Sequence, residues 1–260
     1  MSFRNLLIDN RGSIRLVTLN RPDKLNALNR ETLVELHQAF DDAGNDATVR
    51  VVVLTGAGPK AFVAGADIAE MEGLSPVQAR DFSRFGQKLM VRIEQLGKPV
   101  IAMINGFALG GGMELAMCCH LRIAADTARL GQPEINLGLV PGFGGTQRLL
   151  RLAGRAAALE LCLLGQPIDA ARAHALNLVT QVVPAAELES TAMAIAGQLA
   201  NAAPQALRGI LDAVLIGGEA GLEAGLEFET QAFAIAFSTE DMKEGTGAFL
   251  ARRKAQFTGR

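Results

Sequence analysis

Short β-rich segments alternate with longer helical segments along most of this chain. The run "VRVVVLTG" at 49–56 is almost continuously β-branched, which is typical of a strand buried on both faces. The run "KPVIAMINGF" from Lys98 repeats that character. Between them, "SPVQARDFSRFGQKLMVRIEQLG" predicts a helix with Ser75 as its N-cap and Pro76 in its first turn. This alternation indicates an α/β fold.

The two ends of the chain differ from this middle part. Near the N-terminus, "NLLID" and "SIRLVTLN" flank "NRG", which predicts a β-hairpin, and "NALNRETLVELHQAFDDA" then has helical spacing. From Pro184 onward strand signals disappear and helices dominate. We place a boundary near Pro204, which divides the chain into a core at 1–203 and a helical region at 204–260.

The helical region is too apolar for a solvated appendage. Its large side chains are spread over more than one face of the predicted helices and include Phe228, Phe233, Phe237 and Phe249. Packing of this region on another subunit would explain them.

Composition limits the partners and the compartment. The chain has 260 residues, of which 49% are hydrophobic, and a net charge of -2 without a long run of Lys or Arg. Such a chain can bury one large core but carries no field that attracts nucleic acid or a membrane surface. It has three cysteines without a CxxC pair, no signal-like N-terminus and no apolar run of ~18 residues. We therefore predict a cytoplasmic protein with no nucleic-acid or membrane partner.

Several cofactor and nucleophile motifs are absent or incomplete. "LTGAGPKA" has glycine spacing resembling a dinucleotide loop, but it does not belong to the first strand–helix unit. "PGFGGTQR" lacks the lysine of a phosphate-binding loop. His37, His120 and His174 lie in separate segments without metal-ligand spacing, and no G-x-S-x-G elbow occurs. We predict no metal and no cofactor.

Two strand-to-helix junctions expose backbone donors instead. In "KAFVAGADIAEM" a strand ends at Gly65, and Asp67 is placed to cap a helix that begins at Ile68. In "NGFALGGGMELAMCC" glycines lead into a helix that starts near Gly111 or Gly112. Free N–H groups at two facing helix starts would form an anion hole. Close packing of helix on strand is the simpler interpretation of the glycines.

Two acids accompany these donors. Glu114 falls on the first turn of the second helix among apolar residues, where burial of an unpaired carboxylate is costly. It could simply balance the helix dipole. Glu134, about twenty residues later, also lies in apolar surroundings, in "GQPEINLGLVPGFGGTQRL". Two such carboxylates beside backbone donors suit a general acid and base with shifted pKa values.

An ordered series of motifs now resembles a known family, the enoyl-CoA hydratase or crotonase superfamily. The series is "LNRPDKLNALN", "AFVAGADIAEM", "KPVIAMINGFALGGGMELA", "GQPEINLGLVPGFGGTQRL" and "STEDMKEGTGAFLARRKAQF", and it covers essentially the whole chain. The resemblance implies a spiral of repeated ββα units followed by a helical trimerisation region. Members commonly assemble as trimers or as dimers of trimers.

The resemblance also implies a reaction. The N–H groups of Ala66 and Gly111 would hold the carbonyl oxygen of an acyl-CoA thioester. Glu114 would act as general base on water, and Glu134 would protonate the α carbon. Within the family, a member that keeps both acids resembles a hydratase, and a member with one acid would suggest an isomerase. This chain keeps both, so we expect a hydratase, with an enoyl-CoA isomerase as the alternative. Coenzyme A is then part of the substrate.

Further positions are assigned as substrate-binding by the same resemblance. They are Ala64, Asp67, Ile68 and Ala69 beside the thioester and pantetheine, Gly142 in "PGFGGTQR", Lys24 and Leu25 near the nucleotide, and Arg252 at a CoA phosphate of its own or a neighbouring subunit. Arg252 could equally be an ordinary cation in the last turn of a helix. The segment 72–90 would wall the acyl tail through Phe82, Phe85 and Met90, although core packing explains these three equally well.

One position departs from the family pattern. Members usually have an acid where His120 stands, and a lone His in an apolar context is more often a hydrogen-bonded core residue than a proton carrier. Two non-enzymatic roles would leave other marks in the sequence. RNA binding needs a basic stripe with exposed aromatics, and an inactive scaffold would have lost an acid or a glycine; neither description fits this chain.

Overall fold

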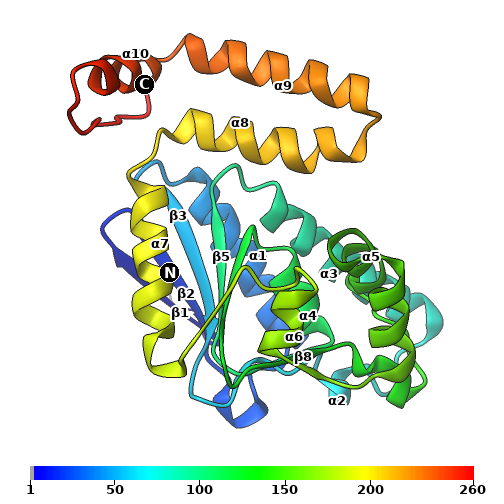
Figure 1. The fold of residues 1–260 in the computed structure, drawn as a ribbon. Helices are drawn as coiled ribbons and strands as arrows, with labels where there is room; N and C mark the ends of the chain where they lie inside the picture. The colour runs from blue at the N-terminus through cyan, green and yellow to red at the C-terminus, as the bar shows by residue number, and fades with distance from the viewer. Residues whose placement is uncertain (1–2) are drawn as a thin grey trace.

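The computed structural model describes residues 3–260, so the first two residues of the predicted core lie outside it. Two sheets form within the described residues (Figure 1). The larger has the order β1 (Leu6–Arg11), β2 (Ile14–Leu19), β3 (Val51–Gly56), β5 (Val100–Ile104), β7 (Leu121–Ala125) and β10 (Gln181–Val183). The smaller has the order β4 (Ala61–Val63), β6 (Phe107–Leu109), β8 (Arg129–Gly131) and β9 (Ile168–Asp169).

The chain winds between the two sheets as a spiral. β3, β5 and β7 enter the larger sheet, while β4, β6 and β8, which follow each of them, enter the smaller one. The pairs β2–β3, β3–β5, β5–β7 and β7–β10 are parallel, and β1 and β2 form the predicted antiparallel hairpin around Gly12. The α/β fold with repeated ββα units is therefore confirmed.

β3 is buried on both faces, which explains its run of β-branched residues. Val52 and Leu54 face the main core, whereas Val51 and Val53 face a second apolar cluster. That second cluster is closed by α7 (Leu188–Ala200), whose small side chains allow it to lie close to the sheet. Alternate residues of one strand thus fill two different cores.

Helices cover the other face and join the strands. They are α1 (Arg30–Asn45), α2 (Ile68–Met71), α3 (Pro76–Glu94), α4 (Gly111–Met117), α5 (Gly145–Leu164) and α6 (Ala170–Ala175), with short 3-10 helices η1 (Pro22–Lys24), η2 (Pro133–Leu137) and η3 (Ala185–Glu187). The predicted cap of α3 is confirmed: Ser75 and Gln78 form a reciprocal capping box. α4 is buried at every residue, in keeping with its apolar sequence.

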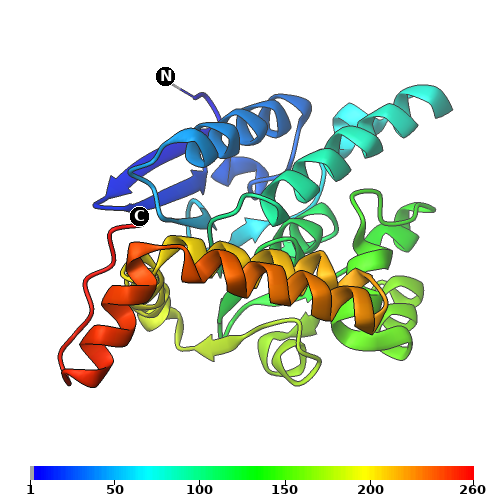
Figure 2. The same ribbon diagram turned by 90° about the horizontal axis from the view of Figure 1, so that it is seen from above.

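The C-terminal helices form a separate layer over one end of the core. They are α8 (Pro204–Leu215), η4 (Gly217–Glu219), α9 (Leu222–Phe237) and α10 (Glu240–Leu250). α8 and α9 pack as an antiparallel pair, which Figure 2 shows crossing the core from above. Neither helix buries a residue, and large apolar side chains such as Leu222 (80% exposed) and Phe233 (65%) are uncovered.

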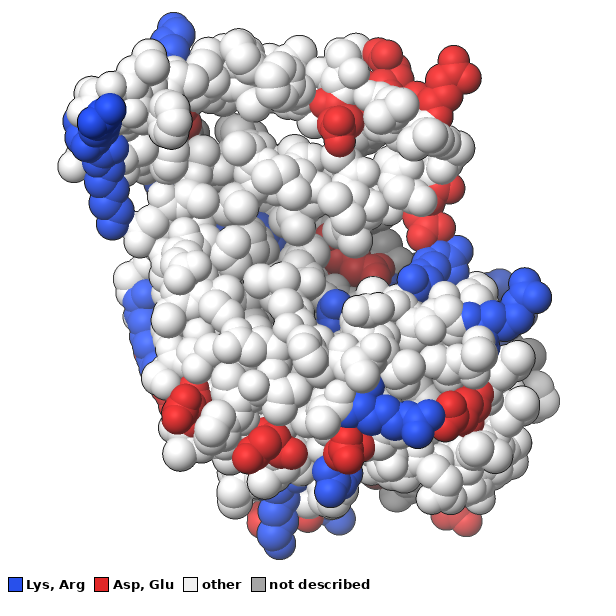
Figure 3. Space-filling model, viewed as in Figure 1, with Lys and Arg blue, Asp and Glu red and all other residues white. Residues whose placement is uncertain are grey.

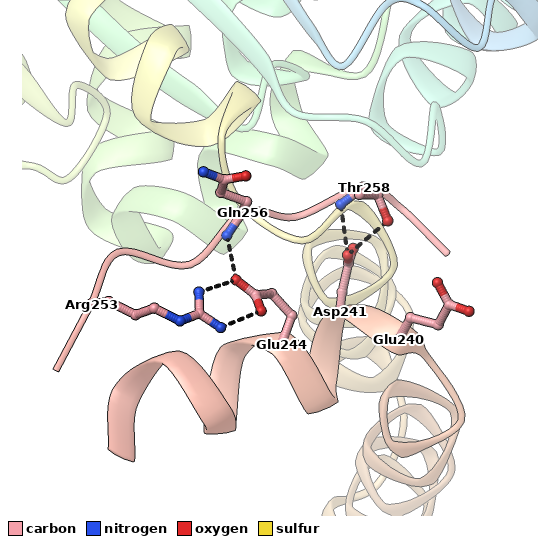
Figure 4. Close-up of a pocket in the computed structure, with 6 residues that line it drawn as sticks. All are labelled: Glu240, Asp241, Glu244, Arg253, Gln256 and Thr258. Atoms are coloured by element: carbon pink, nitrogen blue, oxygen red, sulfur yellow. Dashed lines mark hydrogen bonds and ion pairs between the residues drawn. The ribbon is translucent and has the colours of Figure 1, made fainter. Parts of the chain in front are cut away.

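The end of the chain folds back on α10, and a pocket lies between them (Figure 4). Glu244 pairs with Arg253 at 2.6 Å and accepts the N–H of Gln256 at 2.9 Å. Asp241 accepts the N–H groups of Thr258 and Gly259 at 2.7 and 2.9 Å. The polar groups of this pocket therefore hold the chain end in place.

The visible surface has no concentrated charge. Figure 3 shows acidic and basic side chains in small groups of both signs among uncharged residues on this face. Within residues 3–260, no helix combines the length and the apolar character that a membrane crossing requires.

Candidate active site

Three consecutive glycines join β6 to α4. Gly110 has a φ of 50°, and a Cβ there would lie 2.7 Å from Oε1 of Glu134. A Cβ at Gly112 would lie 2.0 Å from the carbonyl oxygen of Val63, so only glycine allows α4 to pack directly on β4. Close packing, the simpler interpretation, is confirmed for Gly112. At Gly111, where the helix begins as predicted, a Cβ would lie 3.3 Å from the ring of Phe143, so packing also favours glycine there.

Gly111 faces the other strand-to-helix junction. A Cβ on Gly111 would lie 3.5 Å from the backbone nitrogen of Ala66, so the two residues are close neighbours. Ala66 is held by a parallel bridge to Leu28 that uses the N–H groups of Leu28 and Asp67 and leaves its own N–H out. Among the described residues, neither Ala66 nor Gly111 has a recorded backbone hydrogen bond from its N–H. This arrangement suits an anion hole.

Glu114 is almost fully buried, at 1% exposure, on the first turn of α4. Its Oε1 accepts the N–H of Phe143 at 2.8 Å and the N–H of Gly145 at 2.6 Å. Burial raises the pKa of Glu114 to about 7, although these two hydrogen bonds and the charge of Arg148 act to lower it. A helix-dipole role alone would not need these two donors from outside the helix.

Glu134 lies on the first turn of η2 and is partly buried, and burial raises the pKa of its carboxyl group as well. The fully buried amide of Gln132, oriented with its nitrogen toward Glu134, donates to both carboxylate oxygens at 2.9 and 3.1 Å. A Cβ at Gly145 would meet both this amide, at 2.6 Å, and Oε1 of Glu114, at 2.9 Å. The two acids therefore belong to one buried site, joined through Gln132 and Gly145.

The predicted CoA-binding segments lie side by side. The N–H of Ala64 donates to the carbonyl oxygen of Leu25 at 3.0 Å, and the N–H of Leu28 donates to Gly65 at 2.8 Å. Leu25 follows η1 in a left-handed conformation and, like Lys24, is exposed. These backbone contacts bring Leu25 and Leu28 beside the segment 64–66.

Asp67 differs from its prediction in one respect. It stands at the N-cap of α2, which begins at Ile68 as predicted, but its side chain does not cap the helix. Its carboxylate instead pairs with Arg21 at 2.9 Å, because that guanidinium is partly buried and needs an acceptor. Ile68 and Ala69 are exposed at the start of α2.

The last two predicted binding residues have different surroundings. The carbonyl oxygen of Gly142 accepts from Ser83 at 2.5 Å and from Gln87 at 3.0 Å, so the loop before α5 is tied to α3. Arg252 follows α10, is exposed and has a φ of 52°. Figure 1 places α10 and α2 at opposite ends of the molecule, so Arg252 and the other binding residues are not brought together within one chain.

The three predicted acyl-wall residues separate into two groups. Met90 is fully buried, 3.4 Å from Sγ of Cys118, and is a core residue. Phe82 and Phe85 are partly buried, and the ring of Phe82 lies 5.3 Å from that of Phe143. Only these two phenylalanines remain candidates for the wall.

His120 is a hydrogen-bonded core residue, as predicted. Its Nδ1 accepts the N–H of Val100 at 2.8 Å, so Nε2 carries the proton and donates to the carbonyl oxygen of Glu94 at 3.0 Å. Burial lowers the pKa of this imidazole, which favours the neutral form. His120 therefore has a structural role just before β7, where it accepts the N–H of Val100.

Sequence reasoning missed the residues that hold the two acids. Gln132 precedes Glu134 by two positions, and Phe143 and Gly145 belong to "PGFGGTQR". Their only signal was their place inside conspicuous motifs, because a backbone N–H leaves no mark in a sequence. Among residues 3–260, no group of three His, Cys, Asp or Glu side chains is arranged to hold a metal ion.

Comparison with known proteins agrees with this geometry. The chain matches the family model for enoyl-CoA hydratase/isomerase over residues 9–260. It is 46% identical to the short-chain-enoyl-CoA hydratase of Clostridium acetobutylicum, with 98% of each chain covered, and 44% identical to the crotonyl-CoA hydratase of Syntrophomonas wolfei, with 99% of each covered. The crystal structure of an enoyl-CoA hydratase from Bacillus anthracis matches with a TM-score of 0.95 at 41% identity, covering 99% of this chain and 100% of that chain. Because the family model matches residues 9–260 and relatives of 44 to 46% identity cover nearly the whole chain, the chain belongs to the enoyl-CoA hydratase/isomerase family.

Proposed function

We propose that this chain is an enoyl-CoA hydratase, a hydro-lyase that adds water reversibly across the 2,3 double bond of a 2-enoyl-CoA. The observation that carries the proposal is one buried site with two carboxylates of raised pKa beside the N–H groups of Ala66 and Gly111. The full-length similarity to proteins named as short-chain and crotonyl-CoA hydratases supports it.

The two N–H groups act on the thioester. Addition of water to the β carbon pushes electron density onto the carbonyl oxygen, and donors aimed at that oxygen stabilise the enolate-like transition state. Each donor contributes roughly 3 to 4 kcal/mol if it resembles a measured oxyanion donor. Because these groups are backbone atoms at helix starts, they need little reorganisation during the reaction.

The two acids divide the proton transfers. Glu114, with a pKa of about 7, is a base near neutral pH and takes a proton from water as the oxygen bonds to the β carbon. Burial raises the pKa of Glu134 above its ordinary value, and the protonated form of this acid gives a proton to the α carbon. The product is a 3-hydroxyacyl-CoA. No electron acceptor is needed, so the proposed reaction uses no cofactor.

The same proposal covers the CoA portion and the assembly. Ala64, Asp67, Ile68 and Ala69 would lie along the thioester and pantetheine, with Gly142 opposite and with Lys24 and Leu25 toward the nucleotide. The exposed apolar faces of α8 to α10 support a homo-oligomer, a trimer or a dimer of trimers, in which Arg252 of one subunit could reach the CoA of another. A cytoplasmic location rests on three free cysteines.

The test is loss of the enoyl absorbance on a panel of 2-enoyl-CoA thioesters of short, long, branched and dicarboxylic acyl groups. We expect turnover of at least the short straight-chain substrate, with the 3-hydroxyacyl-CoA as product. The same panel includes a 3-enoyl-CoA. Movement of its double bond without hydration of any 2-enoyl-CoA would favour the isomerase and contradict the hydratase.

A further inference from the structure

The turn at residues 143–145, which binds the carboxylate of Glu114, is also contacted by Arg148. Phe143 and Gly145 present their N–H groups to the carboxylate, while the carbonyl oxygen of Phe143 accepts from Nη1 of Arg148 at 3.0 Å. Gly144 has a φ of 105°, and a Cβ there would lie 2.3 Å from the same nitrogen. The guanidinium therefore lies directly against the turn, in space that only a glycine leaves open.

The guanidinium is fixed in turn by Glu94, the last residue of α3. Nε and Nη2 of Arg148 each lie 2.7 Å from one carboxylate oxygen of Glu94, a bidentate pair whose side chains are only 14% and 25% exposed. The backbone carbonyl of Glu94 accepts from His120, so the pair is anchored to the start of β7. A chain of contacts thus runs from the core through Glu94 and Arg148 to the turn.

We propose that Arg148, fixed by Glu94, is a positioning residue that sets the 143–145 turn and thereby the orientation and ionisation of Glu114. It touches neither acid directly; it acts through the turn and through its charge. The inference rests on the proposed hydratase function for its kinetic readout only, because the geometry of the turn does not depend on the substrate.

The charges that face Glu114 come from two other elements. Glu134 on η2 raises the pKa of Glu114, and Arg148 on α5 lowers it. Cys162, also on α5, has a thiol whose pKa is raised by burial and by both acids, so it stays neutral near pH 7. Loss of Arg148 removes a positive charge that opposes the effect of Glu134, so we expect the pKa of Glu114 to rise. A base with a higher pKa is ionised only at higher pH.

The experiment compares Arg148→Met with Arg151→Met. Arg151 lies one turn further along α5, in an exposed pair with Glu219, and is the matched control. For Arg148→Met we expect kcat to fall by about 10- to 100-fold, as for a small misplacement of a catalytic group, with little change in KM. The acidic limb of the pH profile should move to higher pH. Arg151→Met should match the wild type in all three quantities.

Two further variants separate positioning from folding. Glu94→Gln keeps the backbone bond to His120 but loosens the guanidinium, and we expect a smaller change in kcat in the same direction. Arg148→Lys keeps the charge without the bidentate geometry, so kcat should fall while the acidic limb moves less than in Arg148→Met. If Arg148→Met does not fold, these two variants decide the question.

Titration of the Glu114 carboxyl carbon by NMR, without substrate, gives a second readout. We expect its pKa to be higher in Arg148→Met than in the wild type. An unchanged pKa together with an unchanged acidic limb would overturn the proposal, even if the variant is less stable. A wild type without hydratase activity would overturn the proposed function but leave this titration as a test of positioning.

Discussion

The core and the C-terminal layer differ in whether their energetically costly groups have partners. In the core, the buried carboxylate of Glu114 is met by two N–H donors, and no buried side-chain polar atom among the described residues lacks a partner. In the C-terminal layer, large apolar groups such as Leu222 and Phe249 (82% exposed) have nothing over them. A single chain therefore provides partners for its buried polar groups but leaves its outer layer uncovered, as expected of a surface that binds another subunit.

The largest expected effect is on the hydration rate, and it follows substitution of the buried carboxylate Glu114. For Glu114→Gln we expect hydration to fall by ~10²- to 10⁴-fold, because an amide cannot take the proton from water. Exchange of the α proton, which depends on Glu134, should survive. Kinetics and deuterium incorporation measure both. Glu223→Gln, on the exposed first turn of α9, serves as the control, and an equal loss in both variants would contradict the assigned role.

The same substitution should raise stability. The pKa of Glu114 is about 7 in the folded chain and ordinarily 4.5, so folding favours the protonated form. That stabilisation is complete below about pH 4.5 and is lost as the pH rises through about 7, by roughly 3 kcal/mol. Glu114→Gln stays neutral and avoids the loss. Its Tm should exceed that of the wild type at pH 8 and approach it near pH 4.5; a difference independent of pH would refute this linkage.

Two helical glycines, one in the core and one in the C-terminal layer, allow the stability of the two regions to be compared. In Gly112→Ala the new Cβ meets the carbonyl oxygen of Val63, so α4 must move, and we expect a loss of ~1–3 kcal/mol in the free energy of unfolding together with hydratase activity. In Gly247→Ala, within α10, the Cβ meets nothing within 4 Å. That variant should be unchanged or more stable by up to ~1 kcal/mol. Denaturant unfolding of both variants makes the comparison.

The smallest effect on the folded chain should follow a change in the outer layer. For Phe233→Lys, at a side chain that is 65% exposed, we expect the subunit fold to persist while the assembly shifts toward smaller species. Sedimentation velocity measures the shift, and circular dichroism measures the fold. Glu223→Gln on the same helix, which changes the net charge by the same amount, is the control. An unchanged assembly in Phe233→Lys would show that this face is not an interface.

Much of the fold could be predicted from local patterns. The hairpin around Gly12, the cap at Ser75 and the start of α4 all depend on residues near one another in the chain, and each is confirmed. Asp67 shows the limit of that reasoning. Its position at the start of α2 was correct, but a distant arginine, Arg21, competes for its carboxylate. Local chemistry places a residue, whereas the choice of its partner depends on the whole fold.

The site divides in the same way. The sequence predicted Glu114 and Glu134 as an acid and base pair from their apolar surroundings, and the family resemblance implied Ala66 and Gly111 as backbone donors. The groups that hydrogen-bond to the two acids were not predicted. The amide of Gln132 contacts Glu134, and the backbone N–H groups of the 143–145 turn contact Glu114. A peptide N–H is present at nearly every residue, so nothing in its sequence marks the two that meet Glu114.

By itself, the sequence determined the alternation of strands and helices, the glycine junctions and the presence of two acids in apolar segments. These follow from side-chain type and spacing, which are local properties. Only the tertiary structure decided that Gly111 lies beside Ala66, that Gln132 and Gly145 join Glu114 to Glu134, and that burial raises the pKa of Glu114 to about 7. Solvation and long-range hydrogen bonds set a pKa, and both exist only when distant segments have packed together.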